Sequence, residues 1–500
     1  MAEDDLETGR RRDPLRRGFA NSPIGPSQAV TLLLSMMLVG LLVCSPLQSR
    51  NDVRMLSLAR PIETAERVFE GNLWLRHAID ATPEPWRQVV EITIGTLDPP
   101  RESAIAVFDD ILRNNGYPRP DLHGEPQSVD PLLLDGVRAR RAFLLLDAER
   151  VEEARVDLER LRVSGRGAFV DGLACAMQNA KPQAGWTFEQ YDTGLAGEDW
   201  IGSSLRLRLA RALGDVERVE ALERDFESHV AKLRRHAVVL GGLQAGALLL
   251  GLVAIGTWLA RNRPALLQGR AEVPPAWTFE AGYATAVRAA FMAILIGFAI
   301  GQAGAWLGLE GVPLLASTLA GFPLVWLMRR RLIHPLGATF SSAFGLDHVR
   351  RPVSWIALAL AILTIQWLGS ELLVDGLGAL GVRPHWTEDQ RSDALLGSWY
   401  GLSLEALVRC AWMPFLAELG SRGLLYLTLR RHYGAWQSAL FSSLLFAAVQ
   451  FASLPGLAVL TWTGIVHCVA FEMCRSLVPN IAGGILSGMI GVAALYWLWS

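Results

Sequence analysis

The sequence predicts an all-α protein: a polytopic bundle of about nine transmembrane helices, with a helical domain inserted outside the membrane. Two observations predict it. Hydrophobic residues make up 51% of the 500 residues and charged residues only 19%. The apolar residues also gather into runs of roughly 17–25 residues, the length that crosses a hydrocarbon core about 30 Å thick. A long polar segment separates the first run from the others, and it predicts the domain outside the membrane.

The first 27 residues are polar and rich in arginine, with arginines at positions 10, 11, 12, 16 and 17. This composition predicts a disordered cytoplasmic tail over residues 1–27. An apolar run follows, and we expect residues 28–48 to form a transmembrane anchor. A cleaved signal peptide is the alternative, because basic residues precede an apolar core, but the run has no small-x-small cleavage site.

Residues 51–236 are polar in character and helical in pattern, and they form the predicted extracytoplasmic domain. The segment DAERVEEA, which begins at Asp147, has a near copy, DVERVEAL, which begins at Asp215. Their separation is twice the roughly 34-residue period of tetratricopeptide helix pairs. A proline-rich stretch at 118–131 interrupts this pattern. Two interpretations stay open: an irregular helical domain, or a degenerate tetratricopeptide-like (TPR-like) array.

The chain from residue 237 onward is predicted to lie in the membrane, with helices in a first part, 237–335, and in a second part, 340–500. The basic turns predict its orientation, because cytoplasmic loops carry an excess of Lys and Arg. With the N-terminus inside, residues 51–236 lie outside, as in a multi-pass protein of the inner cell membrane. The predicted spans are 237–260, 286–309, 312–328, 353–374, 395–417, 436–453, 456–473 and 478–499, and the turns near 261–270, 329–331, 422–431 and Arg475 are cytoplasmic.

Glu418 and Arg422 are a charged pair within an apolar segment, four residues apart and therefore one helical turn from each other. A charge at bilayer depth costs roughly 2.5–3.5 kcal/mol, so the carboxylate needs a partner and the arginine is placed to be one. An ion pair that lets both residues be buried is the structural interpretation of this spacing.

The stretch from Pro414 to Arg431, PFLAELGSRGLLYLTLRR, resembles the first motif of the CAAX-protease and bacteriocin-processing family of intramembrane metalloproteases. The resemblance covers roughly residues 340 to 500. It implies a helical membrane fold in which a glutamate and a histidine activate water against a peptide bond. The family's motif has two adjacent glutamates before the arginine, and here the first of them is replaced by Ala417.

Two further motifs of the family are similar in order and spacing, but not in their reactive side chains. The second motif, Phe-x-x-x-His, corresponds to Phe446 and Gln450. The third, a His followed four residues later by Asn or Asp, falls on Gly484 and Gly488. A glutamine amide neither titrates nor binds a divalent metal as imidazole does, and glycine has no side chain.

We therefore expect a catalytically inactive homologue, in which Glu418 and Arg422 are the retained motif residues. Its membrane domain would bind a transmembrane or prenylated peptide, and its outer domain a protein partner. An active endopeptidase with a site rebuilt around Glu418 is the alternative, and a transporter or lipid-handling protein is a third. His467 is interpreted as a hydrogen-bonded interior residue. No cofactor or metal site is expected, and no nucleic-acid partner, because the basic residues flank spans without interleaved aromatic residues.

Overall fold

The computed structural model is helical, and no strand occurs among the residues that it describes. The predicted all-α class is therefore confirmed. The tail 1–27, part of the expected anchor and most of the proline-rich stretch at 118–131 lie outside the described residues. The described residues are 28–38, 61–94, 100–114, 129–178, 180–181, 187–191, 197, 199–261, 271–307, 316, 318–346, 352–382, 403–404, 406–450 and 453–499.

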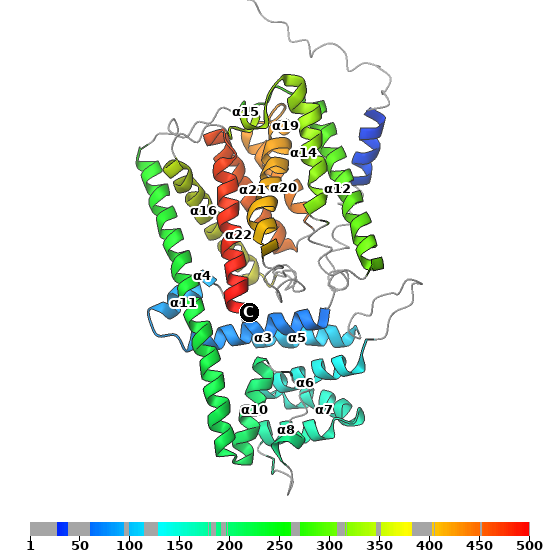
Figure 1. The fold of residues 1–500 in the computed structure, drawn as a ribbon, viewed down its shortest axis with the longest axis vertical. Helices are drawn as coiled ribbons and strands as arrows, with labels where there is room; N and C mark the ends of the chain where they lie inside the picture. The colour runs from blue at the N-terminus through cyan, green and yellow to red at the C-terminus, as the bar shows by residue number, and fades with distance from the viewer. Residues whose placement is uncertain are drawn as a thin grey trace, which may run out of the picture.

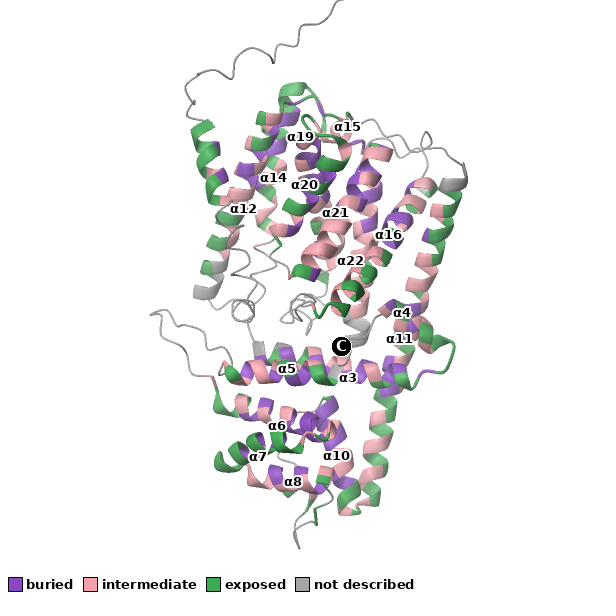
Figure 2. Ribbon diagram, turned by 180° about the vertical axis from the view of Figure 1, so that it is seen from behind, coloured by how far each residue is buried: buried purple, intermediate pink, exposed green. Residues whose placement is uncertain are grey.

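The upper part of the molecule in Figure 1 is a bundle of long apolar helices. Among the described residues, four helices are long and apolar enough to cross a membrane, at Val216–Thr257, Phe279–Ile300, Val353–Ala379 and Leu454–Cys474. Figure 2 shows many exposed residues on the outer helices of the bundle, as expected where side chains face lipid. The chain is a membrane protein. Its helices here are α11 (Val216–Arg261), α12 (Phe279–Leu307), α14 (Phe322–Met328), α16 (Pro352–Ala379), α20 (Ala435–Ala448), α21 (Leu454–Cys474) and α22 (Val478–Trp499).

Residues 408–429 form one uninterrupted helical segment. It consists of a π-helical turn η7 (Val408–Trp412), α18 (Met413–Glu418), a π-helical stretch η8 (Leu419–Tyr426) and α19 (Leu427–Leu429). The predicted end of a span at 417 and the predicted turn beginning at 422 are therefore wrong. The helix continues because Arg422 is neutralised inside the bundle by Glu418 and does not need to reach water.

One helix joins the membrane bundle to the helical domain within residues 51–236, which is called the outer domain after the expected topology. This domain includes α3 (Pro61–Asp80) and α10 (Trp200–Leu213). α11 runs without a break from Val216 to Arg261, so the expected domain boundary at 236/237 falls inside it. Its polar first half contacts α3 and α10, and its apolar second half contacts α16 and α22. In Figure 1 it stands along one edge of the whole molecule.

The outer domain is a helical layer with its own apolar core. Three phenylalanines, Phe69, Phe108 and Phe143, are fully buried at its centre. Asp147 ends α6 and Asp215 directly precedes α11, so both lie at turns between helices. The TPR-like array remains a prediction. The helices of this domain are α3 (Pro61–Asp80), α4 (Trp86–Ile94), α5 (Pro100–Arg113), α6 (Pro131–Asp147), α7 (Val151–Val163), α8 (Gly167–Gln178), α9 (Phe188–Tyr191) and α10 (Trp200–Leu213).

Short helical turns close the end of the bundle that lies away from the outer domain. They follow α14, and α15 lies at the top of the bundle in Figure 1. A buried core that includes Phe344, Leu424 and Phe471 holds this end together. The turns are η3 (Arg329–Ile333), η4 (His334–Leu336) and α15 (Phe340–Phe344).

Candidate functional site

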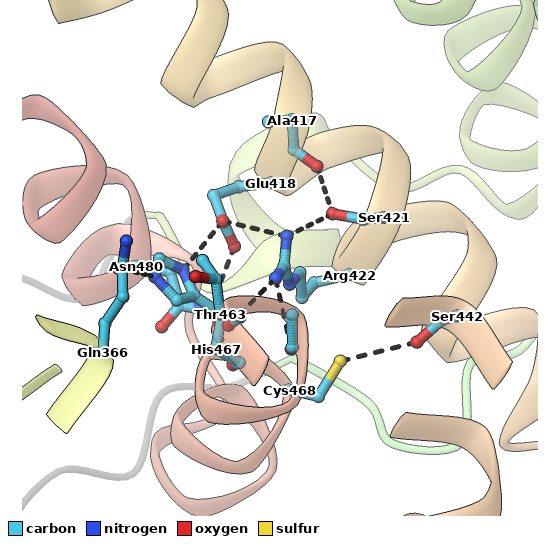
Figure 3. A network of polar contacts seen from close by, with 11 residues as sticks. Gln366, Ala417, Glu418, Ser421, Arg422, Ser442, Thr463, His467, Cys468 and Asn480 are labelled. Carbon is cyan, nitrogen blue, oxygen red and sulfur yellow. Dashed lines mark hydrogen bonds and ion pairs between the residues drawn. The ribbon is translucent and has the colours of Figure 1, made fainter. Parts of the chain in front are cut away.

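A buried carboxylate, that of Glu418, is the centre of a polar cluster inside the bundle (Figure 3). Its Oε1 lies 3.1 Å from Nη1 of Arg422, one turn later on the same helical segment. The same oxygen lies 2.8 Å from Nδ1 of His467 on α21, a close contact that is not aligned as a hydrogen bond. Its Oε2 accepts a hydrogen bond of 3.1 Å from the Asn480 side chain on α22. Three helical segments therefore converge on one carboxylate.

His467 and Asn480 are held in place by second contacts. His467 Nε2 lies 3.2 Å from Oε1 of Gln366, on α16. The Asn480 amide also donates to the backbone carbonyl of His467, at 2.8 Å. Both residues are buried, and a buried polar group is costly unless it is hydrogen-bonded. These contacts fix the imidazole and the amide beside Glu418.

Arg422 is only 1% exposed, and its guanidinium group donates hydrogen bonds to several acceptors. Its Nη2 donates to the carbonyl of Gly464 at 3.2 Å, and Nη1 also donates to the Ser421 hydroxyl. The guanidinium carbon lies 5.4 Å from the centre of the Phe446 ring. A cation over an aromatic face is stabilised by the ring quadrupole. The predicted Glu418–Arg422 ion pair is thus present in the structure, and it has neighbours on two other helices.

Of the other predicted motif positions, Phe446 contacts the cluster through Arg422, whereas Ala417, Gln450, Gly484 and Gly488 bring no side chain to it. Ala417 contributes its backbone carbonyl, which accepts from the Ser421 hydroxyl. Gln450 is exposed in the turn that follows α20. Gly484 faces Pro414, where an added Cβ would lie 2.9 Å from the proline Cβ. Gly488 packs on the backbone of Arg409 and Cys410 in the same way, with an added Cβ 2.7 Å from the Arg409 carbonyl oxygen.

Sequence reasoning missed the partners that the structure brings to Glu418. His467, Asn480 and Gln366 belong to none of the positions at which the family's motifs place reactive groups. Each is, however, a polar residue in an otherwise apolar segment. That is a signal in itself, because polar side chains within membrane helices turn inward and pair with one another. The sequence interpretation of His467 as a hydrogen-bonded interior residue agrees with this placement.

The cluster does not fit a resident divalent metal. Both nitrogens of His467 already face protein oxygens, one of Glu418 and one of Gln366. Among the described residues, no group of three or more His, Cys, Asp and Glu side chains is arranged to hold a metal ion. A catalytic zinc site takes three protein ligands and leaves one position open. No step is therefore assigned to a metal here.

Comparison with known proteins agrees with the sequence resemblance. Residues 399–486 match the family model of the type II CAAX prenyl endopeptidase Rce1-like proteins. The matched region contains Glu418, Arg422, His467 and Asn480. Over these residues the chain is similar to the CAAX-protease family. Neither the curated proteins nor the solved structures gave a match to the chain.

An apolar groove of about 520 Å³ lies beside the cluster. Its walls come from α11, α16 and α21, with Trp436 of α20 at one side. Ile365 and Val466 line it and directly neighbour Gln366 and His467 in the chain. Thr257 and Ser354 are the polar residues among those that line the groove. Such a surface suits a hydrocarbon chain better than a polar ligand.

Proposed function

We propose that this protein is a catalytically inactive member of the CAAX-protease family, which binds a prenylated peptide in the membrane without cleaving it. The observation that carries the proposal is the set of contacts that the Glu418 carboxylate makes. Both of its oxygens contact protein groups, on Arg422, His467 and Asn480. A general base must instead reach the water from which it takes a proton.

The motif positions support the same conclusion. Peptide hydrolysis needs a base, and donors or a metal where oxygen charge develops. Ala417 has no titratable group, Gln450 is exposed beyond α20, and Gly484 packs against Pro414. Loss of members of one catalytic unit leaves little activity, because their contributions are not additive.

The groove between α11, α16 and α21 is the proposed site of the lipid chain. It lies on the bundle, its lining is nearly all apolar, and it is large enough for a long hydrocarbon. The name of the matching family refers to prenylated substrates, and this is the reason for choosing a prenyl chain over other apolar ligands. The peptide would then lie at the membrane surface, near the groove.

A photo-crosslinking experiment tests binding and cleavage together. A farnesylated peptide that carries a photoreactive group on its lipid is irradiated with the purified protein. We expect crosslinks on α16 and α21, and recovery of the peptide at full length. The variant Ala357→Phe, which fills the groove, should lose the crosslinks, while Ala411→Phe, at an exposed position of η7, should keep them. Equal labelling by a peptide without the prenyl group would refute the proposed site.

A second candidate function is an active endopeptidase with a rebuilt site. The specific observation in its favour is that a Glu, a His and an Asn meet inside a fold of this family, although the His and the Asn come from unexpected positions. In addition, Asn480 Oδ1 is buried without a partner among the described residues, so it is free to orient a reacting group. The same experiment would establish this alternative if the wild type yielded a shortened peptide. Neither Glu418→Gln nor His467→Gln should then shorten the peptide.

We further propose that the protein is a multi-pass protein of the inner cell membrane, with residues 51–236 outside. The short apolar helices Gln28–Leu38, Ala435–Ala448 and Val478–Ala494 support additional crossings beside the four long ones. The outer domain, with its separate core, would recruit a protein partner to the membrane.

A further inference from the structure

Three consecutive arginines directly follow α14, on the side of the bundle away from the outer domain. Arg329, Arg330 and Arg331 are all exposed and belong to η3. Trp326, one turn earlier, is 50% exposed, and the Arg330 guanidinium lies 5.3 Å from the centre of its ring. Tryptophan prefers the level of the lipid headgroups. The aromatic ring therefore places this turn at the membrane surface.

Several other arginines of the described residues pair with carboxylates. In the outer domain, Arg140, Arg141 and Arg208 each pair with a carboxylate at 2.7 Å. At the same end of the bundle, Arg430 pairs with Glu472 at 2.8 Å. Within the described part of the chain, no carboxylate lies within ion-pair distance of Arg329, Arg330 or Arg331.

The turn carries three positive charges in a row, and α12 packs beside it. An arginine fork binds phosphate oxygens in pairs, and basic clusters next to a transmembrane helix attract anionic lipids. The surroundings of the turn are therefore complementary to a phosphate group.

We propose that Arg329, Arg330 and Arg331, with Trp326, form a binding site for the headgroup of an anionic phospholipid. The guanidinium groups bind the phosphate, and Trp326 holds the turn at headgroup level. The acyl chains extend along α14, where the side chain of Phe322 is 52% exposed. The site is independent of the Glu418 cluster, so it can be right or wrong whatever the outcome for the proposed function.

Lipid retention measured by native mass spectrometry tests this site. The full-length protein is purified in mild detergent and titrated with phosphatidylglycerol or phosphatidylcholine. We expect preferential retention of phosphatidylglycerol, and a loss of affinity of about 30-fold in the double variant Arg330→Gln/Arg331→Gln, from two contacts of ordinary strength. The matched control, Arg155→Gln/Arg162→Gln, removes two exposed arginines from α7 and should bind as the wild type does.

Three outcomes would overturn the proposal. Equal retention of the two lipids would show that charge does not matter. Equal phosphatidylglycerol binding by the double variant and the control would place the lipid elsewhere. Displacement of the lipid by millimolar inorganic phosphate would show a site for free phosphate. If the double variant does not fold, the wild type decides: phosphatidylglycerol binding must weaken steeply between low and high salt, and unchanged binding rejects the site.

Discussion

Glu418 can be buried in an apolar bundle because its neighbours compensate its carboxylate. Arg422, His467 and Asn480 come from two other helices and from its own, so the carboxylate also ties these segments together. A buried ion pair contributes little net stability when it is intact, but removal of one partner leaves an uncompensated charge. This asymmetry makes the cluster testable by substitution.

Glu418→Gln should destabilise the membrane domain by about 3–5 kcal/mol, because Arg422 then stays buried without its counter-ion. The measurement is thermal unfolding of the purified protein in detergent. Glu371→Gln is the control, since this glutamate lies exposed on α16 and should change the melting temperature little. Equal melting temperatures for the wild type and Glu418→Gln would show that the pair does not stabilise the fold.

Restoring the family's residues should not create peptidase activity. The variant combines Ala417→Glu, Gln450→His and Gly484→His. The histidine at 450 would sit in the exposed turn after α20, and the one at 484 would collide with Pro414. Overpacking of this kind typically costs about 1–3 kcal/mol. Activity assays on prenylated peptides and thermal unfolding are the measurements. Gly376→Ala, which has open space around an added Cβ, is the control for a tolerated substitution.

The sequence could predict the Glu418–Arg422 pair because its spacing is local, within one helical turn. It could not predict that His467, Asn480 and Gln366 meet this pair, since their contacts depend on how α16, α21 and α22 pack. For Gly484, the sequence motif suggested a role that the structure does not show. Its place in the motif pointed to a lost catalytic position. Its physical role is to allow two helices to approach closely, as small residues do in membranes.

At the scale of elements, the junction of α3, α6 and α10 contains two glutamates around the buried Arg140. Arg140 of α6 contacts Glu66 at 2.8 Å and Glu70 at 2.7 Å, both on α3. The Ile201 amide of α10 donates to Glu70 at 3.0 Å. Burial raises the pKa of Glu66 and of Glu70 to about 7, an effect that the Arg140 charge opposes and Asp199 reinforces.

These raised pKa values predict that the outer domain becomes more stable as the pH falls from about 7 toward 4.5. The folded state favours the protonated carboxyls, so their contribution is fully present below the unfolded pKa of 4.5 and is lost as the pH rises through about 7. Thermal unfolding of the full-length protein at several pH values measures this. Glu66→Gln should reduce the dependence, and Glu152→Gln, on the surface of α7, should leave it unchanged. A melting temperature that falls with acidification would contradict the prediction.

The order of the elements could be predicted better than their ends. Apolar runs placed α16, α20, α21 and α22 within a few residues, because a membrane span has a fixed length. The predicted end of a span at 417 was wrong. In a sequence, a charged pair resembles the boundary of a span, but it can lie inside the bundle when both charges are compensated.

At the scale of the whole molecule, α15, which follows the basic turn η3, and the outer domain lie at opposite ends (Figure 1). The expected orientation, in which the turn at 329–331 faces the cytoplasm, requires such a separation. Protease added to intact spheroplasts should therefore cleave within residues 51–236 and spare the turn at 329–331. Immunoblotting with tags at the two positions measures it. Cleavage of the turn, with protection of the outer domain, would show that the protein has the opposite orientation in the membrane.

The continuity of α11 has a thermodynamic consequence. A helix of 46 residues is about 69 Å long at 1.5 Å per residue. Its first half carries the outer domain, and Ala254 and Ile255 in its second half form a wall of the groove. If the outer domain binds a partner, as proposed, and this partner tilts it, the wall moves and the affinity of the groove for its ligand changes. By reciprocity, occupancy of the groove would then change the affinity for that partner by the same factor.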